Sequence, residues 1–233
     1  MRTLPEFLYT PDIYHSQNYV VLDFETTSLD YGSAINNLNN LVLACWLQVR
    51  GNERRYKHSW GGEYSHPDLL GDIASADFLV AQNAKFELQW LKRMGVNLRR
   101  VLPADTFLAQ WVLDGNLMLP RDLDSLAAKY DAPPKHQQVA DMIAAGVDVR
   151  DVPKEWLKQY CYGDVTTTHE VFLRQLEELE RRDMMHIWHT RNLTCAVISD
   201  MEFTGMTLDK DRVREEYVTQ MARREQLKRE LDE

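Results

Sequence analysis

VVLDFETT, residues 20–27, is the stretch that decides the fold. Its β-branched, apolar beginning predicts a buried strand over Asn18–Phe24. Because side chains alternate between the faces of a strand, Asp23 and Glu25 point to the same side, roughly 6.5–7 Å apart along the strand. Two carboxylates held together repel each other unless a cation lies between them, and Mg²⁺ is a cation that binds such oxygens. Taken alone, the pair also fits a solvated strand end.

The elements around this strand indicate an α/β fold. Strands are predicted over Leu41–Arg50 and Glu53–Trp60, joined by a Gly51-Asn52 turn typical of a hairpin. A short helix then begins at Pro67, and a short strand covers Asp77–Gln82. Helices predominate afterwards, over residues 83–94, 105–113, 123–130, 138–145, 153–182, 183–203 and 209–233. Antiparallel strands followed by interleaved helices predict a mixed sheet flanked by helices, with further helices at the C-terminal end.

The composition bounds the class of protein. The chain has 233 residues, of which 44% are hydrophobic, enough to bury a core. Its apolar runs fall far short of the ~20 residues that a membrane span needs, so we expect no membrane partner. No apolar secretory region is visible near the start, and three scattered cysteines favour reduced thiols, which predicts a cytoplasmic location, or the host cytoplasm for a viral protein. The net charge of −9 counts against nucleic acid as a partner.

Two further strings place carboxylates next to helices. VAQNAKFE, residues 80–87, puts an asparagine, an aromatic ring and Glu87 where a short strand gives way to a helix. YCYGD, residues 160–164, puts Tyr160 and Asp164 four residues apart, and therefore adjacent on one helical face. Each string alone fits an ordinary surface position. Their joint occurrence, in this order and on these elements, predicts a shared site.

Together, the three strings resemble the Exo I, Exo II and Exo III motifs of the proofreading 3′→5′ exonucleases. These enzymes are the DEDD group of the ribonuclease H-like (DnaQ-like exonuclease) fold. The Tyr-x-x-x-Asp form of the third string resembles the DEDDy branch. The position five before Asp164, which is histidine in the other branch, is Gln159 here.

Three supporting strings extend the resemblance to the family A, polymerase I-like DNA polymerases. DTFLA at 105–109 and DLDSLA at 122–127 resemble strings of their exonuclease domain. MEFTGMTLD at 201–209 resembles the passage with which they enter their polymerase domain. The resemblance implies an exonuclease domain over residues 1–182 and, over 183–233, a helical segment leading towards a polymerase domain.

The resemblance also implies an activity and its cofactors. Such enzymes hydrolyse the terminal phosphodiester of a DNA 3′ end, release nucleoside monophosphates and proofread during DNA replication. Two divalent ions, Mg²⁺ or Mn²⁺, are the implied cofactors. A single-stranded or frayed DNA 3′ end and a polymerase domain or subunit are the implied partners. The implied ligands and catalytic residues are Asp23, bridging both ions, Glu25 and Asp164 on the ion that activates water, Glu87 towards the second ion, and Tyr160, which orients the water.

Four further positions match residues that contact the terminal nucleotides in the family, namely Thr26, Leu29, Asn83 and Phe86. Apolar and aromatic side chains suit a frayed strand end because stacking tolerates any sequence. Glu87 departs from the family, whose second motif normally ends in Asp. One extra methylene moves the carboxylate by roughly 1–1.5 Å, so we expect a weaker second metal site, retained activity and better activity in Mn²⁺ than in Mg²⁺.

Two alternatives stay open. One is a stand-alone RNA exonuclease similar to ribonuclease D, which shares the three motifs but not the polymerase-like string at 201–209. The other is a degenerate, non-catalytic scaffold, against which the intact acidic and tyrosine positions argue. The helix predicted over 209–233 has only a thin apolar stripe, so we expect either a longer chain or a docked partner. Metal ions on the carboxylates would reconcile the acidic chain with a nucleic-acid substrate.

Overall fold

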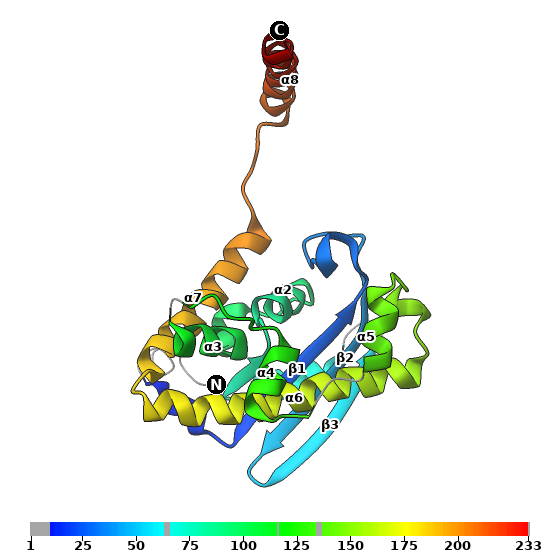
Figure 1. The fold of residues 1–233 in the computed structure, drawn as a ribbon. Helices are drawn as coiled ribbons and strands as arrows, with labels where there is room; N and C mark the ends of the chain where they lie inside the picture. The colour runs from blue at the N-terminus through cyan, green and yellow to red at the C-terminus, as the bar shows by residue number, and fades with distance from the viewer. Residues whose placement is uncertain (1–9, 63–65, 116, 134–136, 233) are drawn as a thin grey trace. The chain divides into compact units, whose positions relative to one another are not determined.

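A five-stranded sheet lies at the centre of the computed structural model, which describes residues 10–62, 66–115, 117–133 and 137–232 (Figure 1). The strand order is β3-β2-β1-β4-β5, so β1 occupies the middle of the sheet. The strands are β1 (Asn18–Thr26), β2 (Leu41–Arg50), β3 (Glu53–Trp60), β4 (Phe78–Ala81) and β5 (Pro103–Asp105). A central β1 explains why the VVLDF run is apolar on both faces.

The sheet is mixed, with an antiparallel beginning, as predicted. β1 pairs antiparallel with β2, and β2 pairs antiparallel with β3. β4 and β5 are added in parallel on the other side of β1. The β2–β3 turn has Gly51 at φ +59°, a backbone conformation that glycine adopts without steric cost. The prediction of this hairpin is confirmed.

Helices cover both faces of the sheet (Figure 1). They are α1 (Pro67–Ser75), α2 (Lys85–Arg93), α3 (Thr106–Asp114), α4 (Leu123–Tyr130), α5 (Gln137–Ala144), α6 (Lys154–Arg181), α7 (Met185–Thr204) and α8 (Lys210–Asp232). Four short 3₁₀ segments accompany them, over Pro11–His15, Leu29–Gly32, Leu98–Arg100 and Val149–Asp151. These bounds agree closely with the helices predicted from the sequence pattern.

The long helix α6 packs on one face of the sheet. Val21 of β1 and Cys45 of β2 form a single buried cluster with Val165 and Phe172 of α6. Burying each aliphatic or aromatic side chain of this kind contributes about 1.5–3 kcal/mol relative to exposure. The same face also carries Asp23 and Glu25, because they follow Val21 at intervals of two residues along β1. The packing of α6 therefore determines what these carboxylates meet.

Helices α1 and α2 cover the opposite face. Leu22 and Trp46 of the sheet are buried there against Leu69 of α1 and Leu88 of α2. A buried carboxylate, Asp72, ties α1 to the hairpin. It accepts hydrogen bonds from the Trp46 indole at 2.9 Å, from the Lys57 ammonium at 2.7 Å and from the Gln48 amide. A buried charge satisfied by several donors fixes the relative position of the elements that it joins.

The chain divides into two compact units, Met1–Phe203 and Thr204–Glu233. Helix α7 belongs to the first, where the indole of Trp188 is buried and donates to the carbonyl of Asp105 at 3.0 Å. The second unit is formed by α8, which Asp209 caps by accepting a hydrogen bond from the Arg212 amide at 3.1 Å. The polymerase-like character of residues 183–233 stays a prediction. Among the described helices, none has the length and apolarity to cross a membrane.

Candidate active site

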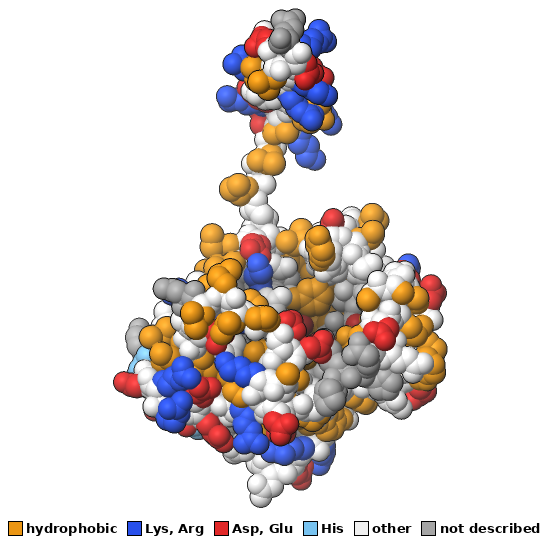
Figure 2. Space-filling view, viewed as in Figure 1, with side chains coloured by type: hydrophobic (Ala, Val, Ile, Leu, Met, Phe, Trp, Pro, Cys, Tyr) orange, Lys and Arg blue, Asp and Glu red, His pale blue; other side chains and the backbone are white. Residues whose placement is uncertain are grey.

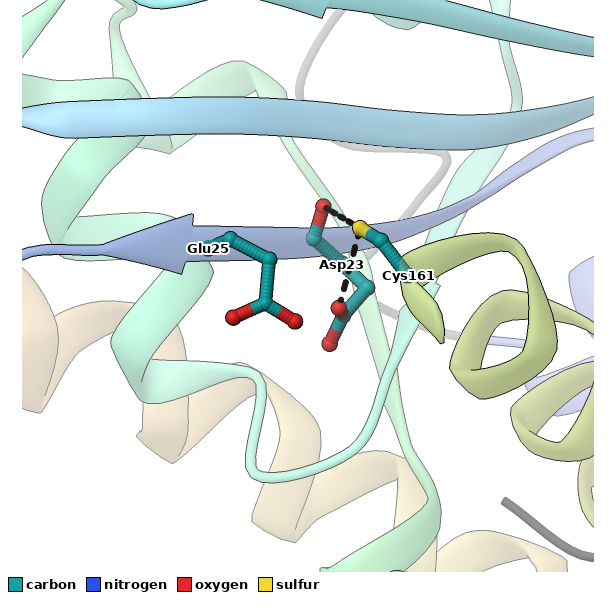
Figure 3. A group of neighbouring side chains, drawn as sticks. All are labelled: Asp23, Glu25 and Cys161. Atoms are coloured by element: carbon teal, nitrogen blue, oxygen red, sulfur yellow. Dashed lines mark hydrogen bonds between the residues drawn. The ribbon is translucent and has the colours of Figure 1, made fainter. Parts of the chain in front are cut away.

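Strand β1 supplies two carboxylates that project to the same side, as its alternation predicted (Figure 3). A third side chain, Cys161, approaches them from α6. One oxygen of Asp23, one oxygen of Glu25 and the sulfur of Cys161 all lie within 4.8 Å of one another. The Cys161 thiol donates to Asp23 Oδ2 at 3.3 Å and lies 3.7 Å from the Asp23 carbonyl oxygen. The two carboxylates thus form one acidic cluster.

Helix α6 brings Tyr160 and Asp164 to this cluster. Both are nearly buried, with 8% and 5% of their surface exposed. The pKa of Tyr160 is raised above its ordinary value, chiefly by burial and then by the charges of Asp164, Glu25 and Asp23. Charges influence a buried phenol in this way only from nearby, so the first and third sequence strings meet at this point.

Helix α2 brings the remaining acidic residue, Glu87, which is only 3% exposed. Burial raises its pKa well above the ordinary value, and the charge of Asp23 raises it further. Its Oε2 is buried and meets no hydrogen-bond donor among the described residues. A buried carboxylate oxygen without a donor is costly unless a cation binds it. Together with the Asp23–Glu25 cluster, it makes a set of oxygen donors that fits divalent cations.

A residue that is distant in sequence holds the beginning of α2. Asn83, a residue type that often caps helices, does not cap α2: the capping position is Ala84, which makes no side-chain cap hydrogen bond. Asp105, at the end of β5, accepts the hydrogen bonds of the first amides instead. Its Oδ1 accepts from the Asn83 amide and its Oδ2 from the Ala84 amide, both at 3.0 Å. Burial raises the pKa of Asp105 to about 6, although these bonds oppose the shift.

The four positions predicted to contact nucleotides lie around the end of β1 and the beginning of α2. Thr26 is buried at the end of β1, whereas 51% of Leu29 is exposed in the following 3₁₀ segment. Asn83 is exposed, with φ +59°, and Phe86 is half-buried. A Cβ at Gly32 would lie 2.4 Å from Thr26 Oγ1 and 3.4 Å from Phe86 Cε2, so Thr26 and Phe86 flank one point of the backbone.

Sequence reasoning missed Cys161. Its pKa is raised well above the ordinary thiol value by burial, by a hydrogen bond with Cys45 and by the charge of Asp23. The group therefore stays a thiol at neutral pH and serves as a donor to Asp23. Cys161 is separated from Asp23 by 138 residues, and no local pattern reveals a contact of that range. All three cysteines are free thiols, as predicted.

The fold and the acidic cluster define the class to which this chain is structurally similar, the ribonuclease H-like exonuclease fold. Two solved structures support this assignment. Brucella melitensis NrnC superimposes with a TM-score of 0.62 at 15% identity, covering 88% of this chain and 91% of its own. The same protein with bound Mg²⁺ gives 0.60, also at 15% identity, covering 85% and 90%. The predicted fold class is confirmed.

Similarity in sequence leads to DNA polymerases. DNA polymerase DpoZ of Acinetobacter phage SH-Ab 15497 is 28% identical over 152 residues, which are 60% of this chain and 24% of that protein. DNA polymerase I of Chloroflexus aurantiacus is 30% identical over 140 residues, 58% of this chain and 14% of that protein. The matches thus span a quarter or less of these relatives. No family model matches the chain. The resemblance to polymerase I-like enzymes is confirmed.

Proposed function

We propose that the chain is a metal-dependent 3′→5′ exonuclease that removes nucleoside monophosphates from DNA 3′ ends and proofreads for a DNA polymerase. The observation that carries the proposal is the convergence of Asp23 and Glu25 of β1 with Glu87 of α2 and Tyr160 and Asp164 of α6. Acidic residues gathered from three elements repel one another and destabilise the fold unless cations bind between them, which is typical of a functional site. The sequence similarity to two DNA polymerases supports DNA as the substrate.

The acidic residues would hold divalent ions, as the unpartnered oxygen of Glu87 supports. Asp23, Glu25, Glu87 and Asp164 are the proposed ligands of two ions, Mg²⁺ or Mn²⁺. When bound, such ions offset the negative charge of the phosphate and supply a nucleophilic water. The Cys161 thiol, by donating to Asp23 Oδ2, keeps that carboxylate oriented.

Tyr160 positions the water that attacks the phosphate. Its raised pKa keeps the phenol protonated at neutral pH, so the hydroxyl acts as a hydrogen-bonding group and not as the general base. Thr26, Leu29, Asn83 and Phe86 are the proposed contacts to the terminal nucleotides. The exposed Leu29 and the half-buried Phe86 offer apolar surface to unstacked bases of any sequence.

The direction of degradation tests the proposal. A single DNA strand labelled at its 3′ end should lose the label in one step in the presence of Mg²⁺ or Mn²⁺, as a mononucleotide. The same strand labelled at its 5′ end should shorten progressively. Asp23→Asn should abolish both reactions, whereas Asp68→Asn, at an exposed carboxylate of α1, should leave them unchanged. Internal cleavage products, or activity that survives Asp23→Asn, would refute the proposal.

Substrate preference is tested on matched strands. DNA and RNA oligonucleotides of one sequence, degraded side by side, should show faster removal of deoxynucleotides. A clear preference for RNA would favour the ribonuclease D-like alternative. Tyr160→Phe should lower the rate by about 10²-fold or more with little change in metal affinity, because it removes a positioning hydroxyl and no ligand. An equal loss of metal affinity would contradict the role given to Tyr160.

A further inference from the structure

A hollow lies next to the acidic cluster. It is an open cavity of about 630 Å³, within the usual size range of small-molecule sites. Its walls come from the beginning of β2, the end of β3, the C-terminal part of α2 and the segment leading into α6. Asp23, Glu25, Glu87, Tyr160 and Asp164 are not among its described lining residues.

Two backbone relations place the cavity close to the acidic cluster. Leu41, which lines it, pairs with Thr26 at the end of β1, one residue beyond Glu25. Leu157, which also lines it, precedes Tyr160 by three residues on α6, a distance of about 5 Å along the helix axis. A strand bound at the carboxylates, or a nucleotide released from them, therefore lies within reach.

The charge of the cavity is unlike that of the chain. Its described lining residues include Arg93, Arg150 and Lys154 but no Asp or Glu, although the chain carries a net charge of −9. The face drawn in Figure 2 shows Lys and Arg interspersed with Asp and Glu among the coloured residues, without a basic band. A local group of cations in an acidic protein is a site for an anion.

Two of these cations are not neutralised within the described part of the chain. Arg150 is engaged by Asp148 through Nε at 2.9 Å and Nη2 at 2.7 Å, which offsets its charge. Arg93 has no carboxylate partner among the described residues: its guanidinium donates to backbone carbonyls, such as that of Asn36 at 3.1 Å, and its Cζ lies 4.9 Å from the centre of the Trp90 ring. For Lys154, the described residues include no carboxylate within ion-pair distance, and its ammonium lies 5.1 Å from the centre of the Trp60 ring. Arg93 and Lys154 thus keep their charge for a ligand.

The aromatic wall narrows the class of ligand. Trp60 ends β3 and is half-buried, so part of its ring faces the cavity. Gly61 shapes the wall beside it, since a Cβ there would lie 1.8 Å from the Leu41 carbonyl oxygen. An inorganic phosphate would fill a small part of 630 Å³, whereas a base and a phosphate together match the ring and the ammonium.

We propose that this cavity binds a nucleotide unit, with its base on Trp60 and its phosphate at Lys154 and Arg93. The ligand is either a free nucleoside 5′-monophosphate or one unit of a bound strand, which have the same chemistry. That such ligands arise at the neighbouring carboxylates rests on the proposed exonuclease function. The binding itself does not depend on hydrolysis.

The test follows the NMR signal of Trp60, which lines the cavity. The chain has six tryptophans, so ¹⁵N-tryptophan labelling gives six indole N–H signals, and Trp60→Phe identifies the signal of Trp60. The protein is titrated in EDTA, which removes divalent ions from the carboxylates, with 5′-dAMP, deoxyadenosine and a 5′-phosphorylated oligo(dA). Lys154→Gln is compared with Lys158→Gln, which removes a charge from the same helix outside the cavity. The exposed Trp156 is the matched control signal.

The expected result is a shift of the Trp60 signal by 5′-dAMP, by the oligonucleotide, or by both, with the Trp156 signal unmoved. Lys154→Gln should weaken binding about 10-fold, Lys158→Gln should not, and deoxyadenosine should bind at least about 10-fold more weakly than 5′-dAMP. A response to the mononucleotide assigns the cavity to the product, and a response to the oligonucleotide alone assigns it to the strand.

The inference is overturned if no ligand moves the Trp60 signal, or if Lys154→Gln and Lys158→Gln behave alike. Its failure differs from a failure of the proposed function. If the chain has no Mg²⁺-dependent nuclease activity but its Trp60 signal still responds to 5′-dAMP, the proposed exonuclease function is refuted and nucleotide binding in the cavity is supported. If the chain is an active nuclease but nucleotides do not shift the Trp60 signal, the exonuclease function is supported and nucleotide binding in the cavity is refuted.

Discussion

Replacing Asp105 with asparagine should change how the stability of the first unit depends on pH. The carboxylate accepts four backbone N–H groups, from Asn83 and Ala84 at 3.0 Å, from Phe107 at 2.8 Å and from Leu108 at 3.4 Å. It therefore joins the beginnings of α2 and α3. In Asp105→Asn, one acceptor oxygen remains, and the amide nitrogen at the second position meets an N–H group.

The magnitude follows from the pKa of Asp105. Burial raises it from 3.8 to about 6, so the folded state holds the proton more tightly than the unfolded chain does. Stability from this group is complete below the unfolded pKa and is lost as the pH rises through the folded pKa. A shift of about 2 units corresponds to about 3 kcal/mol, of which about 2 kcal/mol is lost between about pH 4.5 and pH 7. Asparagine does not titrate and contributes no such change.

The assay is equilibrium unfolding in urea, followed by tryptophan fluorescence in EDTA across this pH range. The stability of wild type minus that of Asp105→Asn should decrease by about 2 kcal/mol from about pH 4.5 to pH 7. The control is Asp122→Asn, at the exposed cap of α4, where Asp122 accepts from the Ser125 amide at 3.0 Å. A difference that stays constant with pH, or that grows as the pH rises, would refute the electrostatic account of Asp105.

Four further predictions concern packing, an ion pair and metal choice. Gly61→Ala should cost about 3 kcal/mol or prevent folding, because the added Cβ meets the Leu41 carbonyl oxygen at 1.8 Å. Gly71→Ala, in open space within α1, should instead stabilise by about 0.5–1 kcal/mol, both measured by urea unfolding. Asp72→Ala should cost about 3–5 kcal/mol in the same assay, because the Lys57 ammonium loses its buried partner. Glu87→Asp should raise the Mg²⁺-supported hydrolysis rate about 10-fold relative to the Mn²⁺-supported rate, and unchanged rates and metal dependence would contradict the misplaced-carboxylate argument.

Local patterns in the sequence were enough for most of the fold. The bounds of β2 and β3 were predicted as observed, because alternation and a Gly-Asn turn are signals contained within a few residues. β5 was not predicted. It has only three residues, Pro103–Asp105, and exists because β4 offers a parallel edge, which is a tertiary cause.

The candidate site divides in the same way. The strings containing Asp23, Glu87 and Asp164 could be identified because each occupies a short, recognisable motif. The cap of α2 could not be identified from the sequence. Asp105 supplies it from more than twenty residues away, and the neighbouring Asn83 does not. Capping propensity describes which side chains can satisfy the first amides of a helix. It does not exclude a better-placed carboxylate from another strand.

The acidic charge of the chain and its proposed substrate are compatible because charges of opposite sign occupy different places. The carboxylates of β1, α2 and α6 gather where divalent ions would neutralise them, whereas Arg93 and Lys154 lie one or two turns of helix away and have no acidic partner among the described residues. The net charge of −9 repels a strand at long range, but that field is screened within about 10 Å at ordinary ionic strength. Within that distance, the charged groups nearest to the strand determine whether it is attracted or repelled. The proposed exonuclease would therefore bind a strand end through a few contacts at its ions and cations.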